Sequence, residues 1–243
     1  MQDTSVQDRN IADVHSQSAL HRRTMVDCQI RTFDVTDQLL LARLLEVPRE
    51  DFLPAELASL AYSDLALQLK TSNPGEKPRT LLPPLVLARL IQGATLAATD
   101  RVLDVASGTG YSAAILAGLA GSVVALESDP ALFAHLKSNL ESFGLSEVKT
   151  VLGPLADGVA SEGPFDVIFV NGAVETNLAT LFAQLKEGGR LLALTCLPGD
   201  SGGRAGKAVR YEKIDGQTGF RVLFDASAPV LETFRKAEEF TFS

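Results

Sequence analysis

The chain has 243 residues, of which 46% are hydrophobic, and this is enough for one sizeable domain with a packed core. Its formal net charge of −8 argues against nucleic acid as a partner, because clusters of Lys and Arg drive phosphate binding. No apolar stretch approaches the roughly 18 uninterrupted residues of a membrane span, so we expect no membrane association. Cys28 and Cys196 form no Cys-x-x-Cys motif, and we expect a cytoplasmic protein without a metal site.

The first 98 residues are predicted to form a flexible start and a helical cap. Residues 1–20 are polar, with weak periodicity and no secretory signal, so a flexible N-terminus is expected. Residues 21–98 are assigned to an N-terminal helical cap and a substrate-side loop. A leucine stripe predicts a helix over Asp37–Glu46, with Thr36 or Asp34 as its N-cap.

A loop and a helix follow the cap. Two prolines and a glycine predict a loop over Lys70–Arg79, and Pro83-Pro84 is expected to open a helix over Leu85–Ile91. The turn Thr99-Asp100 then begins the third region, residues 99–243.

Strands and helices alternate in this third region. The predicted strands are Arg101–Ala106, Ser122–Glu127, Val148–Leu152, Phe165–Asn171 and Arg190–Thr195, and the predicted helices are Tyr111–Leu119, Pro130–Phe143 and Thr176–Lys186. Segments Lys207–Ile214 and Phe220–Phe224 flank a hairpin turn. The pattern predicts an α/β fold, Rossmann-like and doubly wound, whose seven-stranded sheet is mostly parallel with a C-terminal antiparallel hairpin.

The glycine-rich turn after the first of these strands is the candidate ligand site. Gly108-Thr109-Gly110 allows a ligand to approach bare backbone at the start of a helix. A dinucleotide is one candidate ligand, with Glu127 on its ribose. However, Asp104 would face a pyrophosphate unfavourably and suits the ammonium of an amino acid. A nucleoside joined to an amino acid is S-adenosylmethionine.

The sequence resembles a known family at several places. Val102–Gly110 is similar to motif I of class I methyltransferases, and Phe165–Asn171 resembles one of their later motifs. Met25–Arg31, Val47–Pro54 and Ala61–Asp64 resemble the N-terminal region of protein-L-isoaspartate O-methyltransferases. The resemblance implies S-adenosyl-L-methionine as cofactor and a carboxylate of a damaged, isoaspartyl protein or peptide as substrate.

The resemblance also implies which residues form the site. The cofactor's methionine and ribose would be wrapped by the motif I turn, its ribose hydroxyls held by Glu127, and its adenine flanked by Gly153 and its neighbours. The cofactor-binding residues expected in this way are Asp104, Ala106, Ser107, Gly108, Thr109, Gly110, Tyr111, Glu127, Ser128, Gly153, Pro154, Leu155, Asn171 and Gly172. Thr80, Leu82 and Asn171 are the candidates on the substrate side, and no catalytic residue is assigned.

Three positions depart from the family pattern. Ala106 replaces the first glycine of motif I, and Pro154 stands where an acidic residue is usual. Leu82 stands at a serine position and has no hydroxyl to offer a substrate. Arg79, in the preceding loop, is interpreted as a solvated side chain, with pairing to an acidic substrate as the alternative. The departures keep two alternatives open, namely another methyl acceptor and a non-catalytic relative that serves as a binding module. The glycine pattern with Glu127 leaves a nicotinamide dehydrogenase as a third alternative, against which Asp104 counts.

Overall fold

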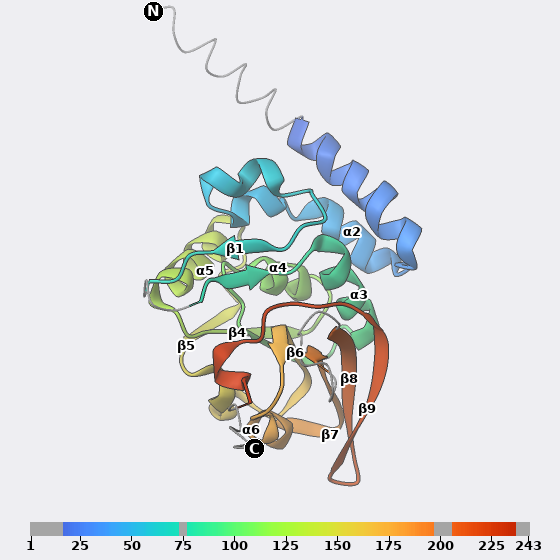
Figure 1. Ribbon diagram of the computed structural model, residues 1–243, viewed down its shortest axis with the longest axis vertical. Coiled ribbons are helices and arrows are strands. Elements are labelled where there is room, and N and C mark those ends of the chain that lie inside the picture. Colours follow the sequence, from blue (N-terminus) through green and yellow to red (C-terminus); the bar gives the residue numbers. More distant parts are fainter. Residues whose placement is uncertain (1–16, 73–76, 197–205, 237–243) are drawn as a thin grey trace, which may run out of the picture.

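The computed structural model describes residues 17–72, 77–196 and 206–236. One seven-stranded sheet has the order β5-β4-β3-β6-β7-β8-β9. Figure 1 labels most of these strands, with the β8–β9 hairpin in red. Its strands are β3 (Arg101–Val105), β4 (Ser122–Glu127), β5 (Lys149–Leu152), β6 (Phe165–Val174), β7 (Leu185–Cys196), β8 (Gly206–Ile214) and β9 (Gln217–Asp225). Strands β3 to β7 pair in parallel, whereas β8 and β9 are antiparallel. The predicted fold class and the C-terminal hairpin are confirmed.

Both faces of the sheet are buried at its central strands β3, β4, β6 and β7, as the continuous apolar runs of these strands require. Val102 faces one apolar cluster, while its neighbour Leu103 faces the other. The first face is covered by α3 (Pro84–Ala94), α4 (Tyr111–Ala117) and α5 (Pro130–Ser142). The second face is covered by shorter pieces, namely α6 (Ala179–Ala183), η5 (Leu155–Asp157) and η7 (Glu232–Phe234). The short helix η6 (Ala160–Glu162) follows η5 and buries no side chain of its own. Each large apolar side chain buried in these clusters contributes about 1.5–3 kcal/mol.

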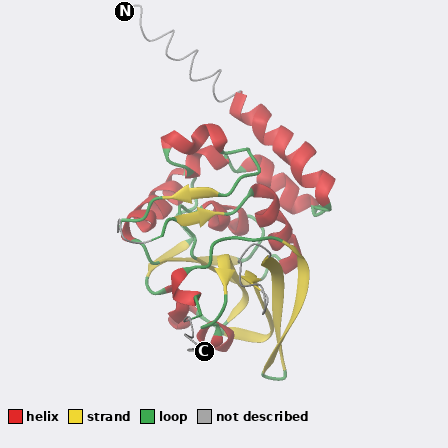
Figure 2. Cartoon of the chain, viewed as in Figure 1, coloured by secondary structure: helices red, strands yellow, loops and turns green. Residues whose placement is uncertain are grey.

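The N-terminal helices lie above the first face (Figure 2). Helical residues 17–24 lead into η1 (Met25–Ile30), η2 (Arg31–Phe33), α2 (Gln38–Glu46), η3 (Arg49–Phe52) and η4 (Ala55–Leu60). Arg43 of α2 ties this layer to α4, because its Nε and Nη2 donate to the carbonyl of Ala114 at 3.1 and 2.7 Å. The N-cap of α2 is Asp37, and not Thr36 or Asp34, since its carboxylate accepts from the next backbone amides. Residues 1–16 of the expected flexible start lie outside the described residues.

A small hairpin replaces part of the loop expected over Lys70–Arg79. Strand β1 (Leu67–Leu69) pairs antiparallel with β2 (Arg79–Leu81), and residues 73–76 between them lie outside the described residues. Leu67 and Leu69 are buried, while Gln68 between them is exposed. The expectation of a loop was wrong at Arg79, which lies in β2. The alternation of buried and exposed residues in β1 is enough to hold the two-stranded hairpin against the core.

The helix predicted over Thr176–Lys186 was also wrong in extent, since α6 covers only Ala179–Ala183. Strand β7 begins at Leu185, which pairs with Phe165 of β6. Gly188, with φ of 74°, lies within β7 where the pairing with β6 shifts register. Pairing with β6 therefore overrides the local helical pattern. Within the described ranges, no helix is long and apolar enough to cross a membrane.

Candidate functional site

The glycine-rich turn between β3 and α4 requires glycine at one position, Gly110. Gly110 has φ of 96°, and a Cβ there would lie 2.9 Å from Cδ1 of Leu136. Ala106 has φ of 57°, which places a methyl-bearing residue in the left-handed region. The replacement of the first motif glycine by Ala106 therefore strains the start of the turn.

Asp104 lies beneath this turn and holds it from inside. Its Oδ2 accepts from the hydroxyls of Ser107 at 2.5 Å and Ser112 at 2.7 Å, and its Oδ1 accepts from Nδ2 of Asn171 at 2.7 Å. Burial raises the pKa of the Asp104 carboxyl to about 6, although these three hydrogen bonds lower it, and the charge of Glu127 raises it further. The carboxylate is fully buried and has no cation among these partners.

Glu127, at the end of β4, is the second buried carboxylate of the site. Its Oε2 accepts from the amide of Gly108 at 2.8 Å, which joins β4 to the glycine turn. Its Oε1 accepts from the amides of Ser128 at 2.8 Å and Asp129 at 3.1 Å. The same oxygen pairs with Nη2 of Arg79 at 2.8 Å. Arg79 is therefore not a solvated loop residue, because its side chain is only 13% exposed.

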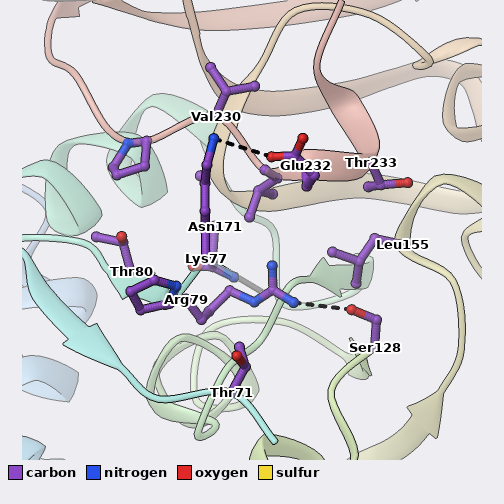
Figure 3. Close-up of a pocket in the computed structure, with 14 residues that line it drawn as sticks. Thr71, Lys77, Arg79, Thr80, Ser128, Leu155, Asn171, Val230, Glu232 and Thr233 are labelled. Carbon is purple, nitrogen blue, oxygen red and sulfur yellow. Dashed lines mark hydrogen bonds and ion pairs between the residues drawn. The ribbon is translucent and has the colours of Figure 1, made fainter. Parts of the chain in front are cut away.

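A cavity of about 450 Å³ opens at the carboxyl ends of β4 and β6 (Figure 3). Its walls come from the β1–β2 hairpin, from the strand ends and from the C-terminal segment 229–233. The lining residues are Thr71, Lys77, Pro78, Arg79, Thr80, Ser128, Leu155, Asn171, Gly172, Pro229, Val230, Leu231, Glu232 and Thr233. Ligands of open parallel sheets bind at this edge.

The C-terminal wall could not be found from the sequence, because segment 229–233 carries no motif. It is held by β6, since the amide of Leu231 donates to the carbonyl of Ala173 at 3.0 Å. Leu231 packs against Gly172 so closely that a Cβ on Gly172 would lie 2.7 Å from its Cγ. An ion pair between Lys77 and Glu232 at 3.5 Å crosses the cavity from the hairpin to this wall (Figure 3).

The predicted site residues divide into two groups. Thr80, Ser128, Leu155, Asn171 and Gly172 line the cavity. The others, apart from Leu82, belong to the glycine turn or to the adjacent strand ends; they are Asp104, Ala106, Ser107, Gly108, Thr109, Gly110, Tyr111, Glu127, Gly153 and Pro154. Gly153 is tied to this group because its amide donates to the carbonyl of Glu127 at 3.0 Å.

Leu82 does not line the cavity. It is 1% exposed, and its carbonyl accepts from Nη2 of Arg49 at 2.8 Å. Arg49 is itself completely buried, with its guanidinium carbon 4.7 Å from the ring centroid of Tyr111 at the start of α4. Leu82 thus belongs to the packing between the N-terminal helices and the glycine turn, and Thr80 is the hydroxyl of this run that faces the cavity.

The buried groups around the turn fit S-adenosyl-L-methionine better than a pyrophosphate. The hydroxyl of Thr109 is buried without a hydrogen-bond partner among the described residues. Two buried carboxylates, Asp104 and Glu127, adjoin the turn and would repel a diphosphate, whereas a carboxylate suits ribose hydroxyls and an ammonium. No group of His, Cys, Asp and Glu side chains within the described ranges is arranged to hold a metal ion.

Comparisons with known proteins agree with this geometry. The family model of protein-L-isoaspartate(D-aspartate) O-methyltransferase matches residues 21–221. A protein-L-isoaspartate O-methyltransferase of Koribacter versatilis (strain Ellin345) is 36% identical over 72% of this chain and 76% of its own. A solved protein-L-isoaspartate O-methyltransferase is 28% identical, with a TM-score of 0.73 over 86% of this chain and 65% of its own.

A second solved structure, from Plasmodium falciparum, is a protein assigned to the same enzyme class in complex with S-adenosyl-L-homocysteine. It is 18% identical, with a TM-score of 0.68 over 88% of this chain and 98% of its own, and it shows the shared fold. The family model covers more than half of the chain, and the Koribacter relative exceeds 30% identity. The chain belongs to the protein-L-isoaspartate (D-aspartate) O-methyltransferase family.

Proposed function

We propose that the chain is an S-adenosyl-L-methionine-dependent O-methyltransferase that methylates the carboxylate of an isoaspartyl residue in damaged protein or peptide. The observation that carries this proposal is the cavity at the carboxyl ends of β4 and β6. There the cofactor-side residues Ser128 and Asn171 face Thr80 and Arg79 of the hairpin. One cavity therefore brings residues expected to bind the cofactor together with residues expected to bind the acceptor.

The chain's own residues fit the two halves of the cofactor. Glu127 would hold the ribose hydroxyls, the turn Ser107–Gly110 would wrap the methionine and ribose part, and Ser128 with Gly153–Leu155 would flank the adenine. Asn171 and Gly172 line the cavity beyond them. When bound, S-adenosyl-L-methionine supplies an electrophilic sulfonium methyl group.

Methylation of a carboxylate requires the protein mainly to position the acceptor. A carboxylate has a pKa near ~4 and is ionised at neutral pH, so no general base is needed to activate it. The described histidines, His21 and His135, are both exposed, and neither lines the cavity. Alignment of the acceptor and exclusion of water then carry the rate enhancement. An alcohol acceptor would require a base, which favours the carboxylate.

Thr80 and Asn171 are the residues best placed to orient the acceptor. Both are about 8% exposed, and both line the cavity. The hydroxyl of Thr80 is a hydrogen-bond donor, and the amide of Asn171 is held by Asp104. Since Leu82 lies away from the cavity, its lack of a hydroxyl removes no group from the described lining. This weakens the argument for a different acceptor that the sequence alone raised.

The domain division proposed from the sequence keeps residues 21–98 as the cap and 99–243 as the cofactor-binding part. The hairpin of the cap supplies one wall of the cavity, which supports its assignment to the substrate side. A cytoplasmic location remains a prediction from the sequence.

Calorimetric titration with S-adenosyl-L-homocysteine and, separately, NAD tests the cofactor assignment. We expect binding of the first and none of the second. Glu127→Ala should weaken S-adenosyl-L-homocysteine by about 1–3 kcal/mol, the cost of losing hydrogen bonds to a charged group. Binding of NAD alone would favour a dehydrogenase, and binding of neither would favour the non-catalytic alternative.

A further inference from the structure

Arg79 connects the hairpin wall of the cavity to the residues at the end of β4. It lies on β2, lines the cavity, and donates from Nη2 to Oε1 of Glu127 at 2.8 Å and to Oγ of Ser128 at 3.0 Å. Its Nε is buried without a hydrogen-bond partner among the described residues. The guanidinium is thus bound through one nitrogen to the carboxylate assigned to the ribose (Figure 3 shows its bond to Ser128).

Glu127 has no room for a further donor on Oε1. That oxygen already accepts from the amides of Ser128 and Asp129 as well as from Arg79. A carboxylate oxygen offers about two lone pairs. Among the described residues, Oε2 accepts from the amide of Gly108 alone and can take one ribose hydroxyl, whereas a second hydroxyl can reach Oε1 only if a present donor leaves. The two amides are fixed, because they open the turn that leads into α5. Arg79 is the one of these three donors that belongs to a side chain and not to the backbone.

Once released from Glu127, the Arg79 guanidinium stays in the cavity beside Thr80, because its backbone is fixed in β2 by pairing with Leu69. The other cation among the lining residues is Lys77, which is 66% exposed, whereas the Arg79 side chain is only 13% exposed. A guanidinium presents parallel N–H groups that match both oxygens of a carboxylate. A negatively charged acceptor entering the cavity therefore meets a matched partner in Arg79.

We propose that Arg79 exchanges one carboxylate for another: it pairs with Glu127 in the cofactor-free protein and with the acceptor carboxylate in the loaded protein. The proposal rests on the proposed function. It makes Arg79 a specificity-determining residue for an anionic acceptor. It also couples the two ligands, because the ribose hydroxyls release Nη2 of Arg79 from Glu127 and leave the whole guanidinium for the acceptor.

The exchange predicts that one variant, Arg79→Gln, changes the affinities for the two ligands in opposite directions. Arg79→Gln should tighten S-adenosyl-L-homocysteine about 2- to 10-fold, because Glu127 no longer has to lose an ion pair. It should weaken binding of an isoaspartyl peptide to the S-adenosyl-L-homocysteine-loaded protein by about 10-fold or more. Arg79→Lys, which keeps the charge without the planar fork, should fall between wild type and Arg79→Gln in both measurements. A residue with a merely structural role would weaken both ligands together.

Both affinities are measured by calorimetry on the full chain, after circular dichroism has confirmed that each variant is folded. Arg101→Gln is the matched control: it removes an Arg–Glu pair, with Glu162 at 3.0 Å, at the opposite end of β3, and should change neither affinity. The same peptide with an amide in place of the isoaspartyl carboxylate should bind wild type and Arg79→Gln equally.

Three results would overturn the exchange. The first is weaker binding of S-adenosyl-L-homocysteine by Arg79→Gln, and the second is unchanged peptide binding by that variant. The third is a loss of peptide binding in Lys77→Gln that equals or exceeds the loss in Arg79→Gln. If the wild type binds both ligands without methyl transfer, the proposed function fails while the two affinities still decide the role of Arg79. If the wild type binds S-adenosyl-L-homocysteine but no isoaspartyl peptide, the acceptor half of the exchange is wrong.

Discussion

Asn171 and Asp104 connect the cavity to the glycine turn. Nδ2 of Asn171, which lines the cavity at the end of β6, donates to Oδ1 of Asp104 at 2.7 Å and to the carbonyl of Val105 at 3.2 Å. Both groups are buried, so the bond is shielded from competing water. The position of the cavity wall and the shape of the turn therefore depend on one another.

Asn171→Ala should lower both stability and cofactor affinity. Loss of the amide leaves a buried carboxylate with one donor fewer, at a cost of about 1–3 kcal/mol in unfolding free energy. Urea denaturation and calorimetry with S-adenosyl-L-homocysteine measure the two effects. Asn171→Asp, which places a second carboxyl beside Asp104, should lose more stability at pH 7 than at pH 5. Equal losses at the two pH values would show that the side chains do not interact.

Asp104 should make stability depend on pH in a defined window. Burial raises its pKa from 3.8 to about 6, so the folded state favours the protonated carboxyl. This contribution to stability is fully present below pH ~3.8 and is lost as the pH rises through ~6. Relative to Asp104→Asn, the wild type should lose about 1–3 kcal/mol of unfolding free energy between pH 4 and pH 7. A difference between the two proteins that is constant over this range would contradict the burial of a titrating group.

Ala106→Gly should stabilise the protein. Ala106 has φ of 57°, where a Cβ is unfavourable, and glycine removes that strain. Because glycine also adds entropy to the unfolded chain, the net gain should be about 0.5–1 kcal/mol in thermal or urea unfolding. Ala113→Gly, in the buried middle of α4, is the control and should destabilise instead. A loss of stability in Ala106→Gly would place the strain elsewhere.

Two ion pairs should differ sharply in their effect on stability. Asp100 and Arg190 are about 10% exposed and lie 2.6 Å apart, and Arg190 also donates to the carbonyls of Ala94 and Thr95. Asp100→Asn leaves a buried guanidinium without its counter-charge and should cost about 3–5 kcal/mol. Glu232→Gln breaks the exposed pairs with Lys77 and Arg235 and should leave the midpoint of urea unfolding unchanged. Equal shifts in the two midpoints would contradict the burial that separates the pairs.

The central strands β3, β4, β6 and β7 could be predicted because they are buried on both faces and therefore carry continuous apolar runs. The range Ser122–Glu127 was predicted without error, and the predicted helix Pro130–Phe143 matches α5 to within one residue. These features depend on local sequence alone. The end of helix α6 could not be predicted in this way. Leu185 pairs with Phe165, twenty residues away, and no local sequence pattern indicates that pairing.

The candidate site was predicted where it follows strand ends, and missed where it depends on distant contacts. Thr80, Ser128, Leu155, Asn171 and Gly172 all line the cavity. The wall from Pro229 to Thr233 was missed, since β6 places it through backbone hydrogen bonds that need no particular side chain. Arg79 was taken for a solvated loop residue because its partner, Glu127, lies 48 residues away.

Methyl transfer to an isoaspartyl peptide tests the central claim most directly. The purified protein is incubated with methyl-labelled S-adenosyl-L-methionine and either that peptide or its ordinary aspartyl counterpart. We expect base-labile label, the signature of a methyl ester, on the isoaspartyl peptide and little on the aspartyl one. Binding of the cofactor without label on either peptide, or equal label on both, would contradict the assignment of this cavity to isoaspartyl carboxylates.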